Sequence, residues 1–462
     1  MSGLSKRGWR LLLAASVFFI CGGGAWAQDA TSPSNTGPAY WAWAATPPMG
    51  WNSYDAFGDS VTEAEVLANA TYLKDHLLSH GWRYVVVDFR WYDGGANSGD
   101  LRQRTGAKLT MDEHGRLLPA PNRFPSAAGG AGFGPLAEKV HGMGLKFGIH
   151  IMRGIARQAV KANCPIEGSD FSAVQAADLN STCAWCPDMF GVDGASAAGQ
   201  AWYDSLFRQY AGWGVDFVKV DDLSRPYHAA EIAAIRKAID KCGRPIVFST
   251  SPGETPIAEA ADISTHANQW RISDDFWDNW RSLNHNFDLL GRWQGVGGPG
   301  HWPDADMIPL GHLAIRSIGK PRQTQFTRDE QVTLISLWAL APSPLMLGMN
   351  LPDDDAWTDS LLTNDAVIAV NQDALGAPAK RVQQDRAAGT EVWVKPLSGG
   401  GAAVGLFNRS SQQQRVVLRA GDIGANGAVR LRDLWTGKVL EMGNEFSATV
   451  APHGTVLVRV ER

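Results

Sequence analysis

The feature that most constrains the fold of this chain is an alternation of short apolar runs with longer helix-like segments between residues 47 and about 350. Eight runs read as buried strands: MGWNS (49–53), YVVVDF (84–89), KFGIHI (146–151), FVKVDD (217–222), PIVFST (245–250), HANQWRI (266–272), HWPDADM (301–307) and SPLMLG (343–348). Eight parallel strands joined by helical crossovers predict a (β/α)8 TIM barrel over residues 47–372.

The segments between these runs have helical periodicity. Residues 63–77, 133–144 and 229–243 carry apolar side chains at helical spacing, and two of the three end at Gly. Thr327 and Glu330 have the spacing of a capping box, which predicts a helix that begins there, before the last strand.

After about residue 375 the pattern changes to apolar and polar residues that alternate with period two between Gly, Asn and Ser turns. The alternating segments are EVWVKPL (391–397), AAVGLFNR (402–409), RVVLRA (415–420), VRLRDLW (429–435), KVLEM (438–442) and TVLVRVER (455–462). This pattern predicts a small antiparallel β-domain over residues 375–462, and we expect a β-sandwich.

The N-terminus has the order of a secretory signal peptide. Lys6, Arg7 and Arg10 precede an apolar run (11–20) and a stretch of small residues that ends at Ala27. We therefore expect residues 1–27 to be removed by cleavage after Ala27, and the chain to be exported to the periplasm or beyond. No later apolar stretch is long enough to cross a membrane. Residues 28–46, rich in Ser, Thr, Pro and Ala, are expected to be a linker or a loosely held arm.

Four cysteines lie beyond the signal segment: Cys164, Cys183, Cys186 and Cys242. In an oxidising compartment they allow three disulfide connectivities. The spacing of Cys183 and Cys186 also suits zinc, but no second pair accompanies it, so we expect one disulfide near residues 164–186.

The formal net charge is -5, and no basic run lies outside the signal segment. A partner nucleic acid is therefore not expected. Neutral solutes such as sugars fit the composition better. The 19 Trp residues suit either a large core or a carbohydrate site, and the oligomeric state stays open.

Carboxylates follow several of the predicted strands: Asp88, Asp221, Asp222, Asp274, Asp275, Asp304 and Asp306. In barrels of this kind the functional residues lie at the carboxyl ends of the strands. Any one of these residues could instead cap the next helix, but so many at one end of a barrel favour a site.

The fourth strand has the most specific pattern. Period-two alternation places Lys219 and Asp221 on one face, where the ammonium would keep the carboxylate ionised, as a nucleophile requires. In the sixth strand segment, Asp275 lies near aromatic and apolar residues that could keep it protonated as a general acid, with Arg271 beside it. Two such carboxyl groups about 5 Å apart perform a retaining glycosidic double displacement.

At these residues the sequence resembles glycoside hydrolase family 27, the α-galactosidase family. The resemblance runs from about Thr46 to the C-terminal β-domain and rests on the ordered motifs TPPMGWNSYDAFG, FVKVDD, WRISDDFWDNW, GPGHWPDADM and SPLMLGMNL. It implies a barrel with an antiparallel C-terminal domain, no cofactor or metal, and an oligo- or polysaccharide substrate. It also implies Asp221 as nucleophile and Asp275 as acid/base, with Asp222 and Asp274 as their non-catalytic neighbours.

The expected sugar-binding residues are Tyr54, Asp88, Lys219, Arg271, Asp306 and Met307 by resemblance, together with Trp91, His150 and Ser251. His150 could equally be core packing, and Trp91 and Trp185 could be sugar platforms or loop packing. The segments 90–130 and 155–200 are expected to form the walls of the subsites.

The chain departs from the family pattern in the expected pocket. Asp88-Phe89 stands where the family has two acids. The third strand ends in residues 149–153, where many members carry a Tyr followed by an acid, and residues 249–253 replace the loop that contacts the sugar's 2-substituent. Cleavage of terminal α-D-galactosides is the first expectation. A β-L-arabinopyranoside, an α-N-acetylgalactosaminide or an isomaltosyl substrate are alternatives on the same fold.

Two other classes of function stay open. One is a carbohydrate-binding protein without activity, which the presence of both Asp221 and Asp275 disfavours. The other is a metal-dependent barrel hydrolase, suggested by His150, His266 and His301, although the chain lacks a His-x-His strand signature.

Overall fold

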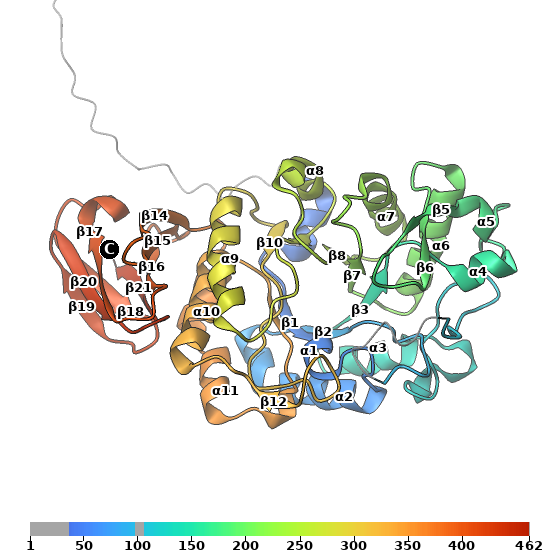
Figure 1. Cartoon of the computed structure of the whole chain (residues 1–462), viewed down its shortest axis with the longest axis horizontal. Coiled ribbons are helices and arrows are strands. Elements are labelled where there is room, and N and C mark those ends of the chain that lie inside the picture. Colours follow the sequence, from blue (N-terminus) through green and yellow to red (C-terminus); the bar gives the residue numbers. More distant parts are fainter. Residues whose placement is uncertain (1–36, 98–105, 462) are drawn as a thin grey trace, which may run out of the picture. The chain divides into compact units, whose positions relative to one another are not determined.

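A computed structural model describes residues 37–97 and 106–461 of the chain (Figure 1). The expected signal peptide, its cleavage point after Ala27 and residues 28–36 of the expected arm lie outside the described residues.

Eight parallel strands form one curled sheet in the order β10-β9-β8-β7-β3-β2-β1-β13. They are β1 (Met49–Asn52), β2 (Tyr84–Val87), β3 (Lys146–Met152), β7 (Phe217–Asp221), β8 (Val247–Thr250), β9 (Gln269–Arg271), β10 (Trp302–Asp304) and β13 (Leu345–Leu347). A parallel bridge between Ile308 and Leu347 joins the two edges, and the Ile308 N–H donates to the Met346 carbonyl at 2.7 Å. The predicted (β/α)8 barrel is confirmed: seven strands lie inside their predicted segments, and β3 extends one residue beyond its segment, to Met152.

Helices connect these strands and surround the sheet (Figure 1). The longer ones are α2 (Glu63–Tyr72), α3 (Gly134–Gly142), α6 (Ala197–Gly212), α7 (Ala229–Lys241), α9 (Trp280–Trp293) and α10 (Arg328–Leu340). Shorter ones are α1 (Tyr54–Phe57), α4 (Arg157–Ala162), α5 (Ala173–Ala176), α8 (Ala260–Ser264), α11 (Ala356–Leu362) and α12 (Asp365–Asn371). Helix α10 begins as predicted: the Glu330 N–H donates to Thr327 Oγ1 (3.2 Å), and the Thr327 N–H donates to Glu330 Oε2 (2.8 Å).

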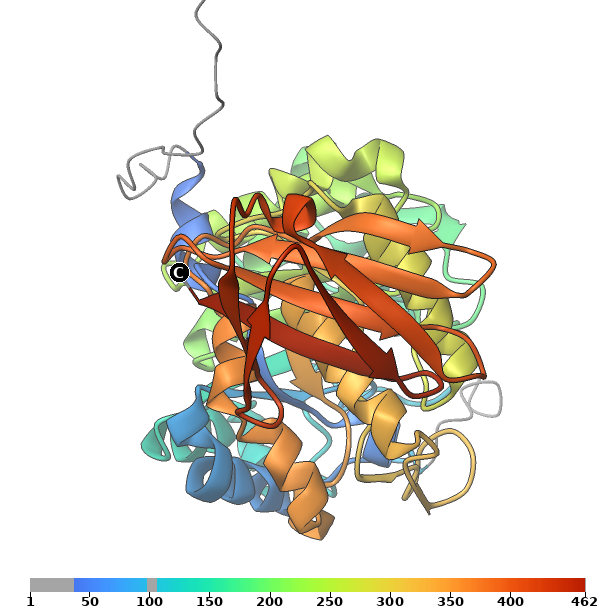
Figure 2. The same ribbon diagram turned by 90° about the vertical axis from the view of Figure 1, so that its left-hand side faces the viewer.

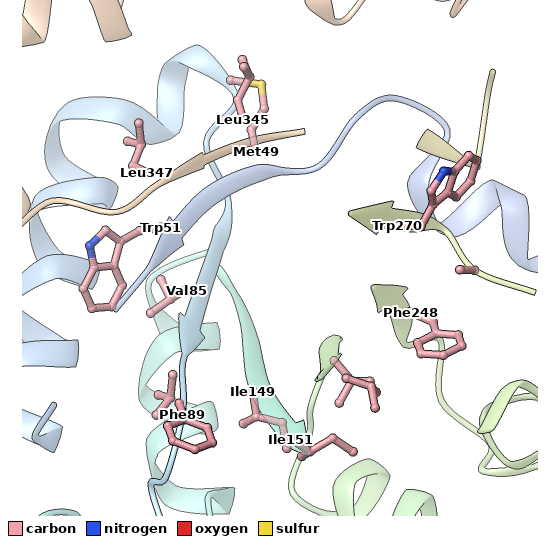
Figure 3. Close-up of a cluster of buried hydrophobic side chains, with 14 of the residues drawn as sticks. Met49, Trp51, Val85, Phe89, Ile149, Ile151, Phe248, Trp270, Leu345 and Leu347 are labelled. Carbon is pink, nitrogen blue, oxygen red and sulfur yellow. The ribbon is translucent and has the colours of Figure 1, made fainter. Parts of the chain in front are cut away.

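Alternation along the strands separates two apolar layers. Figure 3 shows part of the larger layer, which fills the space between strands and helices and includes Trp51, Val85, Ile149, Phe248 and Trp270. A second cluster is formed by the alternate strand positions, and its members include Tyr84, Val86, Phe217, Val247, Trp302 and Met346. On strand β7 the same alternation places Lys219 and Asp221 on the face of Phe217, toward the inside of the barrel.

A small excursion sheet, not predicted from the sequence, lies between β3 and α6 in the chain. It contains β4 (Ile155–Ala156), β6 (Met189–Val192) and β5 (Ala177–Thr182), in that spatial order. Strand β5 (ADLNST) is largely polar and has no regular alternation of apolar and polar residues, so its sequence does not indicate a strand. A two-stranded ribbon of β11 (His312–Leu313) and β12 (Arg322–Gln323) follows β10.

The C-terminal part contains two antiparallel sheets (Figure 2). The first has six strands in the order β14-β15-β16-β21-β18-β19, and the second pairs β17 with β20. Their bounds are β14 (Lys380–Asp385), β15 (Thr390–Pro396), β16 (Ala402–Asn408), β17 (Gln414–Arg419), β18 (Val429–Asp433), β19 (Val439–Met442), β20 (Glu445–Val450) and β21 (Thr455–Glu461). Side chains from both sheets, such as Leu406 and Leu418, share one apolar cluster. The predicted antiparallel β-domain is confirmed, although strands β14 and β20 were not among the predicted segments.

Residues 37–46, expected to belong to a linker or loosely held arm, contain the 3-10 helix η1 (Ala39–Ala44). Its aromatic residues pack on the barrel: the Arg236 guanidinium lies over the Tyr40 and Trp43 rings, and Trp41 stacks on His301 with ring centroids 4.0 Å apart. Aromatic burial therefore holds this described part of the arm in place.

The disulfide expected near residues 164–186 is not formed in the described residues. Cys164, Cys183, Cys186 and Cys242 are all free thiols. Cys164 lies against Gly115, whereas Cys183 and Cys186 interact with Asp222 and Asp188. In residues 37–97 and 106–461, no helix has the length and apolar character to cross a membrane.

Candidate active site

A cavity of about 590 Å³ opens where the strands of the barrel end. Its lining includes most of the residues expected from the sequence: Tyr54, Asp88, Lys219, Asp221, Ser251, Arg271, Asp275, Asp306 and Met307. The two carboxyl groups on which the expected mechanism depends, those of Asp221 and Asp275, thus face one opening.

Asp221 is the last residue of β7, and the surrounding chain holds both of its carboxylate oxygens. His150 Nε2 lies 2.7 Å from Oδ2, and the backbone N–H of Asp222 donates to Oδ1 at 2.6 Å. Only 7% of the residue is exposed. Its orientation is therefore set before a substrate arrives, as nucleophilic attack from a fixed direction requires.

The sequence predicts that Lys219 pairs with Asp221, but in the structure Lys219 pairs with Asp88. Its ammonium donates to Asp88 Oδ2 at 3.0 Å, and Asn52 Nδ2 donates to the same oxygen at 2.7 Å. Burial of Asp88 opposes its ionisation, but Lys219, His150 and Asn52 outweigh burial and hold the pKa of Asp88 well below its usual range. Asp88 is a permanent hydrogen-bond acceptor in the cavity wall.

Asp275 lies in a different environment from the one predicted for a general acid. Its side chain is 56% exposed, and Arg271 Nη2 donates to its Oδ1 at 3.3 Å. The side chain of Asp275 is therefore not enclosed by apolar residues as expected, although Phe276 and Trp277, its neighbours in the sequence, line the same cavity. The open position leaves room for the oxygen of a leaving group or a water.

Arg271 joins Asp275 to a buried acid, Asp306, whose Oδ2 lies 2.7 Å from the same Nη2 atom. Burial raises the pKa of Asp306 to about 6, with Arg271 acting against the shift and Asp275 adding to it. This carboxyl also accepts the Phe276 N–H at 2.8 Å, which ties the loop that carries Asp275 to the barrel.

Backbone strain accompanies the acidic residues at two strand ends. Asp222 (φ 64°) and Asp306 (φ 85°) have left-handed backbone conformations, which are unusual for residues with a side chain. Strain of this kind persists where the surrounding structure imposes it, and it concentrates at functional sites.

The non-catalytic neighbours inferred from the resemblance have other partners. Arg153 Nε donates to the Asp222 carboxylate at 2.9 Å, and Asp274 pairs with Arg225 at the cavity edge.

Two residues expected to contact the sugar do not line the cavity. Trp91 is fully buried, packs against Phe133 and Trp213, and donates from Nε1 to the His150 carbonyl at 2.6 Å. His150 is 1% exposed and lies behind Asp221. Both expectations are wrong, because Trp91 lies in the turn after β2 and packs into the core, and the His150 ring on β3 is covered by Asp221 and Phe89.

Several cavity residues were not among the predicted sugar contacts. Phe89 and Trp185 lie side by side with ring centroids 5.9 Å apart, and both line the cavity, as do Trp277 and Asp55. From the sequence, Phe89 is only a departure from the family's pair of acids, and Trp185 is either a surface for stacking a sugar or loop packing. Asp55 follows Tyr54 directly, and no sequence signal separates it from a helix-capping residue.

A metal-dependent reaction finds no support among the three histidines that suggested it. His150 contacts Asp221, His266 contacts the Asp262 carbonyl, and His301 stacks on Trp41. Throughout residues 37–97 and 106–461, no three His, Cys, Asp or Glu side chains are arranged to hold a metal ion.

Comparison with known proteins links this geometry to one family. The profile described as "Alpha galactosidase A" matches residues 197–373, and the one described as "Alpha galactosidase C-terminal beta sandwich domain" matches residues 387–460. Alpha-galactosidase 2 of Arabidopsis thaliana is 30% identical over 428 residues, which cover 91% of this chain and 90% of the plant protein.

Two bacterial structures have higher identity. The β-L-arabinopyranosidase of glycoside hydrolase family 27 from Geobacillus stearothermophilus, in complex with arabinose, is 49% identical, with a TM-score of 0.89 over 92% of this chain and 99% of that chain. A putative α-N-acetylgalactosaminidase from Bacillus halodurans is 46% identical, with a TM-score of 0.81 over 90% of this chain and 97% of that chain. With the barrel, the C-terminal β-domain and the cavity residues above, these similarities place the chain in glycoside hydrolase family 27, the α-galactosidase family, and make it a glycoside hydrolase.

Proposed function

We propose that this glycoside hydrolase removes terminal β-L-arabinopyranosyl residues with retention of configuration, with Asp221 as nucleophile and Asp275 as acid/base. The observation that carries the catalytic part is that both carboxyl groups line one cavity, one buried and held at both oxygens, the other exposed and beside Arg271.

The proposed reaction has two steps. Asp221 Oδ attacks the anomeric carbon while the Asp275 carboxylic acid gives its proton to the departing glycosidic oxygen, which forms a glycosyl ester and releases the aglycone. Asp275, now ionised, takes a proton from water as that water attacks the anomeric carbon, and the ester bond to Asp221 breaks. Two inversions leave the configuration of the anomeric carbon unchanged.

The charged residues around this pair suit the binding of ring hydroxyl groups. The Asp88 carboxylate accepts hydrogen bonds, and the Lys219 ammonium beside it donates them. On the other side, Arg271 and Asp306 offer a second donor and acceptor. Such paired charges bind hydroxyl groups strongly because each hydrogen bond involves an ionised partner.

The glycone is inferred from Phe89. α-D-Galactopyranose and β-L-arabinopyranose share the arrangement of their ring hydroxyl groups, and galactose carries an additional hydroxymethyl group. Where the family pattern has a second acid after Asp88, this chain presents the Phe89 ring to the cavity, next to Trp185. An apolar wall suits a sugar with one polar substituent fewer, and the 49% identical relative is a β-L-arabinopyranosidase.

A panel of nitrophenyl glycosides tests the glycone: β-L-arabinopyranoside, α-D-galactoside, α-N-acetylgalactosaminide and an isomaltosyl substrate. We expect the highest kcat/KM on the first and weaker activity on the α-D-galactoside, the second candidate, which shares all ring hydroxyl groups. A dominant α-D-galactosidase activity would contradict the inferred glycone, and no turnover of any substrate would contradict the whole proposal.

The catalytic roles have a separate test. Asp221→Ala should remove turnover, and azide should restore it with an inverted glycosyl azide as product, because azide enters the space of the missing carboxylate. Asp275→Ala should slow hydrolysis least for substrates whose leaving group needs no proton, and azide should then give a retained product. A retained azide from Asp221→Ala and an inverted azide from Asp275→Ala would mean that Asp275 is the nucleophile and Asp221 the acid/base.

We also infer export, because the sequence order of residues 1–27 is that of a signal peptide. N-terminal sequencing of the protein secreted by its natural host should begin after Ala27. An intact N-terminus on cell-associated protein would contradict this.

A further inference from the structure

Asp55 is a buried carboxyl at the cavity that the proposed mechanism does not use. It lies in the short helix α1 directly after β1, and it is among the residues that line the cavity. Only 3% of the residue is exposed. Its Oδ2 atom is buried without a hydrogen-bond partner in the part of the chain that the structure describes.

The fold makes room for this carboxyl on its protein side. A Cβ atom added to Gly348, just after β13, would lie 1.9 Å from Asp55 Oδ2 and 2.5 Å from its Cγ. The absence of a side chain at residue 348 therefore leaves the space that the Asp55 carboxyl occupies beside the end of β13. A buried polar group without a partner is costly, and such sites in native proteins usually have a reason in function.

The surroundings favour the neutral form of Asp55. Burial, and then the nearby Asp306 carboxyl, raise the pKa of Asp55 well above its ordinary value, while Lys219 acts in the opposite direction. A neutral carboxylic acid can both donate and accept a hydrogen bond, which matches a hydroxyl group. It complements Asp88, which can only accept.

We propose that the Asp55 carboxyl binds a hydroxyl group of the terminal sugar and so helps to select the glycone. The proposal rests on the proposed glycosidase function of the same cavity. Its ligand is a ring hydroxyl, because the cavity that Asp55 lines also contains Asp221 and Asp275, between which the terminal sugar must lie.

Monodeoxy substrates test the contact directly. The wild-type enzyme, Asp55→Leu and Asp55→Asn are assayed on the parent aryl glycoside and on its 2-, 3- and 4-deoxy forms. In the wild type, loss of a bound hydroxyl should lower kcat/KM by roughly 10–100-fold. Asp55→Leu should lower the activity on the parent by a similar factor and cause little further loss on the one deoxy substrate that lacks the partner hydroxyl. Asp55→Asn, which keeps a donor and an acceptor, should lie between the two.

Two further variants separate binding from structural effects. Gly348→Ala keeps the carboxyl but displaces it, so it should lower kcat/KM on the parent and reproduce the non-additive pattern of Asp55→Leu. Asp354→Asn is the matched control: Asp354 is also a carboxyl whose oxygens are buried without partners, its pKa is raised to about 8 by burial and by Asp359, and it does not line the cavity. This variant should keep the wild-type pattern across all substrates.

Equal losses for Asp55→Leu on the parent and on every deoxy substrate would overturn the proposal, as would unchanged kinetics for Asp55→Asn and Gly348→Ala. An inactive wild type would instead contradict the proposed function itself. If Asp55→Leu does not fold, the Asp55→Asn and Gly348→Ala variants give the same decision.

Discussion

The imidazole Nε2 of His150 lies 2.7 Å from Oδ2 of Asp221, and the His150 ring stands edge-on to Phe89 with centroids 5.3 Å apart. His150 therefore connects the carboxylate proposed as nucleophile to the apolar wall proposed to select the sugar. It is a positioning residue, because the ring is buried and does not line the cavity.

Replacement of this histidine is expected to affect turnover more than substrate binding. His150→Ala removes one of two hydrogen bonds that orient Asp221, so we expect kcat to fall by roughly 10–100-fold with little change in KM. Steady-state kinetics on the preferred aryl glycoside measure both constants. His150→Gln, which can still donate to Asp221, should recover part of kcat. If both variants mainly raise KM, His150 acts in binding instead.

Phe89→Asp should shift the sugar preference. The new carboxylate restores the second acid of the family pattern and can accept a hydrogen bond from the hydroxymethyl group of galactose. We expect the ratio of kcat/KM for α-D-galactoside to that for β-L-arabinopyranoside to rise by at least about tenfold. Phe89→Leu, which stays apolar, is the control and should leave the ratio nearly unchanged. Equal ratios in both variants would show that an acid at residue 89 does not recognise the hydroxymethyl group of galactose.

Trp185→Ala should weaken substrate binding. The residue is 36% exposed and lines the cavity beside Phe89, where a flat apolar ring can pack on the C–H face of a pyranose. We expect KM to rise by roughly tenfold and kcat to change less, whereas Trp185→Phe should keep most of the affinity. Kinetics and a binding titration with free L-arabinose check this, and unchanged KM in Trp185→Ala would assign the ring to loop packing.

Lys395→Met should stabilise the protein near neutral pH. Lys395 on β15 is fully buried, and within the described residues the one hydrogen bond that its ammonium donates is long, 3.4 Å, to the Ala339 carbonyl. Burial lowers the pKa of Lys395 to about 7, with Asp373 acting against the shift. Between about pH 7 and pH 10 the unfolded chain binds more protons than the folded chain, so wild-type stability should rise with pH there.

Each pKa unit corresponds to about 1.4 kcal/mol, so the penalty at pH 7 and below amounts to a few kcal/mol. Thermal unfolding of the wild type and of Lys395→Met between pH 6 and pH 10 measures it. We expect the Tm advantage of the variant to be largest at pH 6 and to shrink as pH rises. A constant difference would mean that the lysine does not change charge on folding.

The barrel could be predicted from the sequence because its signal is local. Apolar runs ended by polar residues, with helical segments between them, mark all eight strands. Period-two alternation also placed Lys219 and Asp221 on one face of β7. Of the strands that were missed, β5 and β14 carry polar residues on both faces, so no periodic signal distinguishes them from loops. Strand β20 does alternate, with Phe446, Ala448 and Val450 on its apolar face, but the alternation is short and includes only one large apolar residue besides Val450.

The partners of the site residues could not be read from the sequence, because they depend on how the barrel closes. Lys219 pairs with Asp88, which is 131 residues away, and Trp91 points into the core although it lies next to cavity residues in the chain. Asp55 lines the cavity with its carboxyl in space that Gly348, 293 residues away, leaves free. Strand periodicity, a property of neighbouring residues, thus determined which side chains reach the end of the barrel. Only the closed tertiary structure, in which distant strand ends meet, decided which of them face the cavity and which face one another.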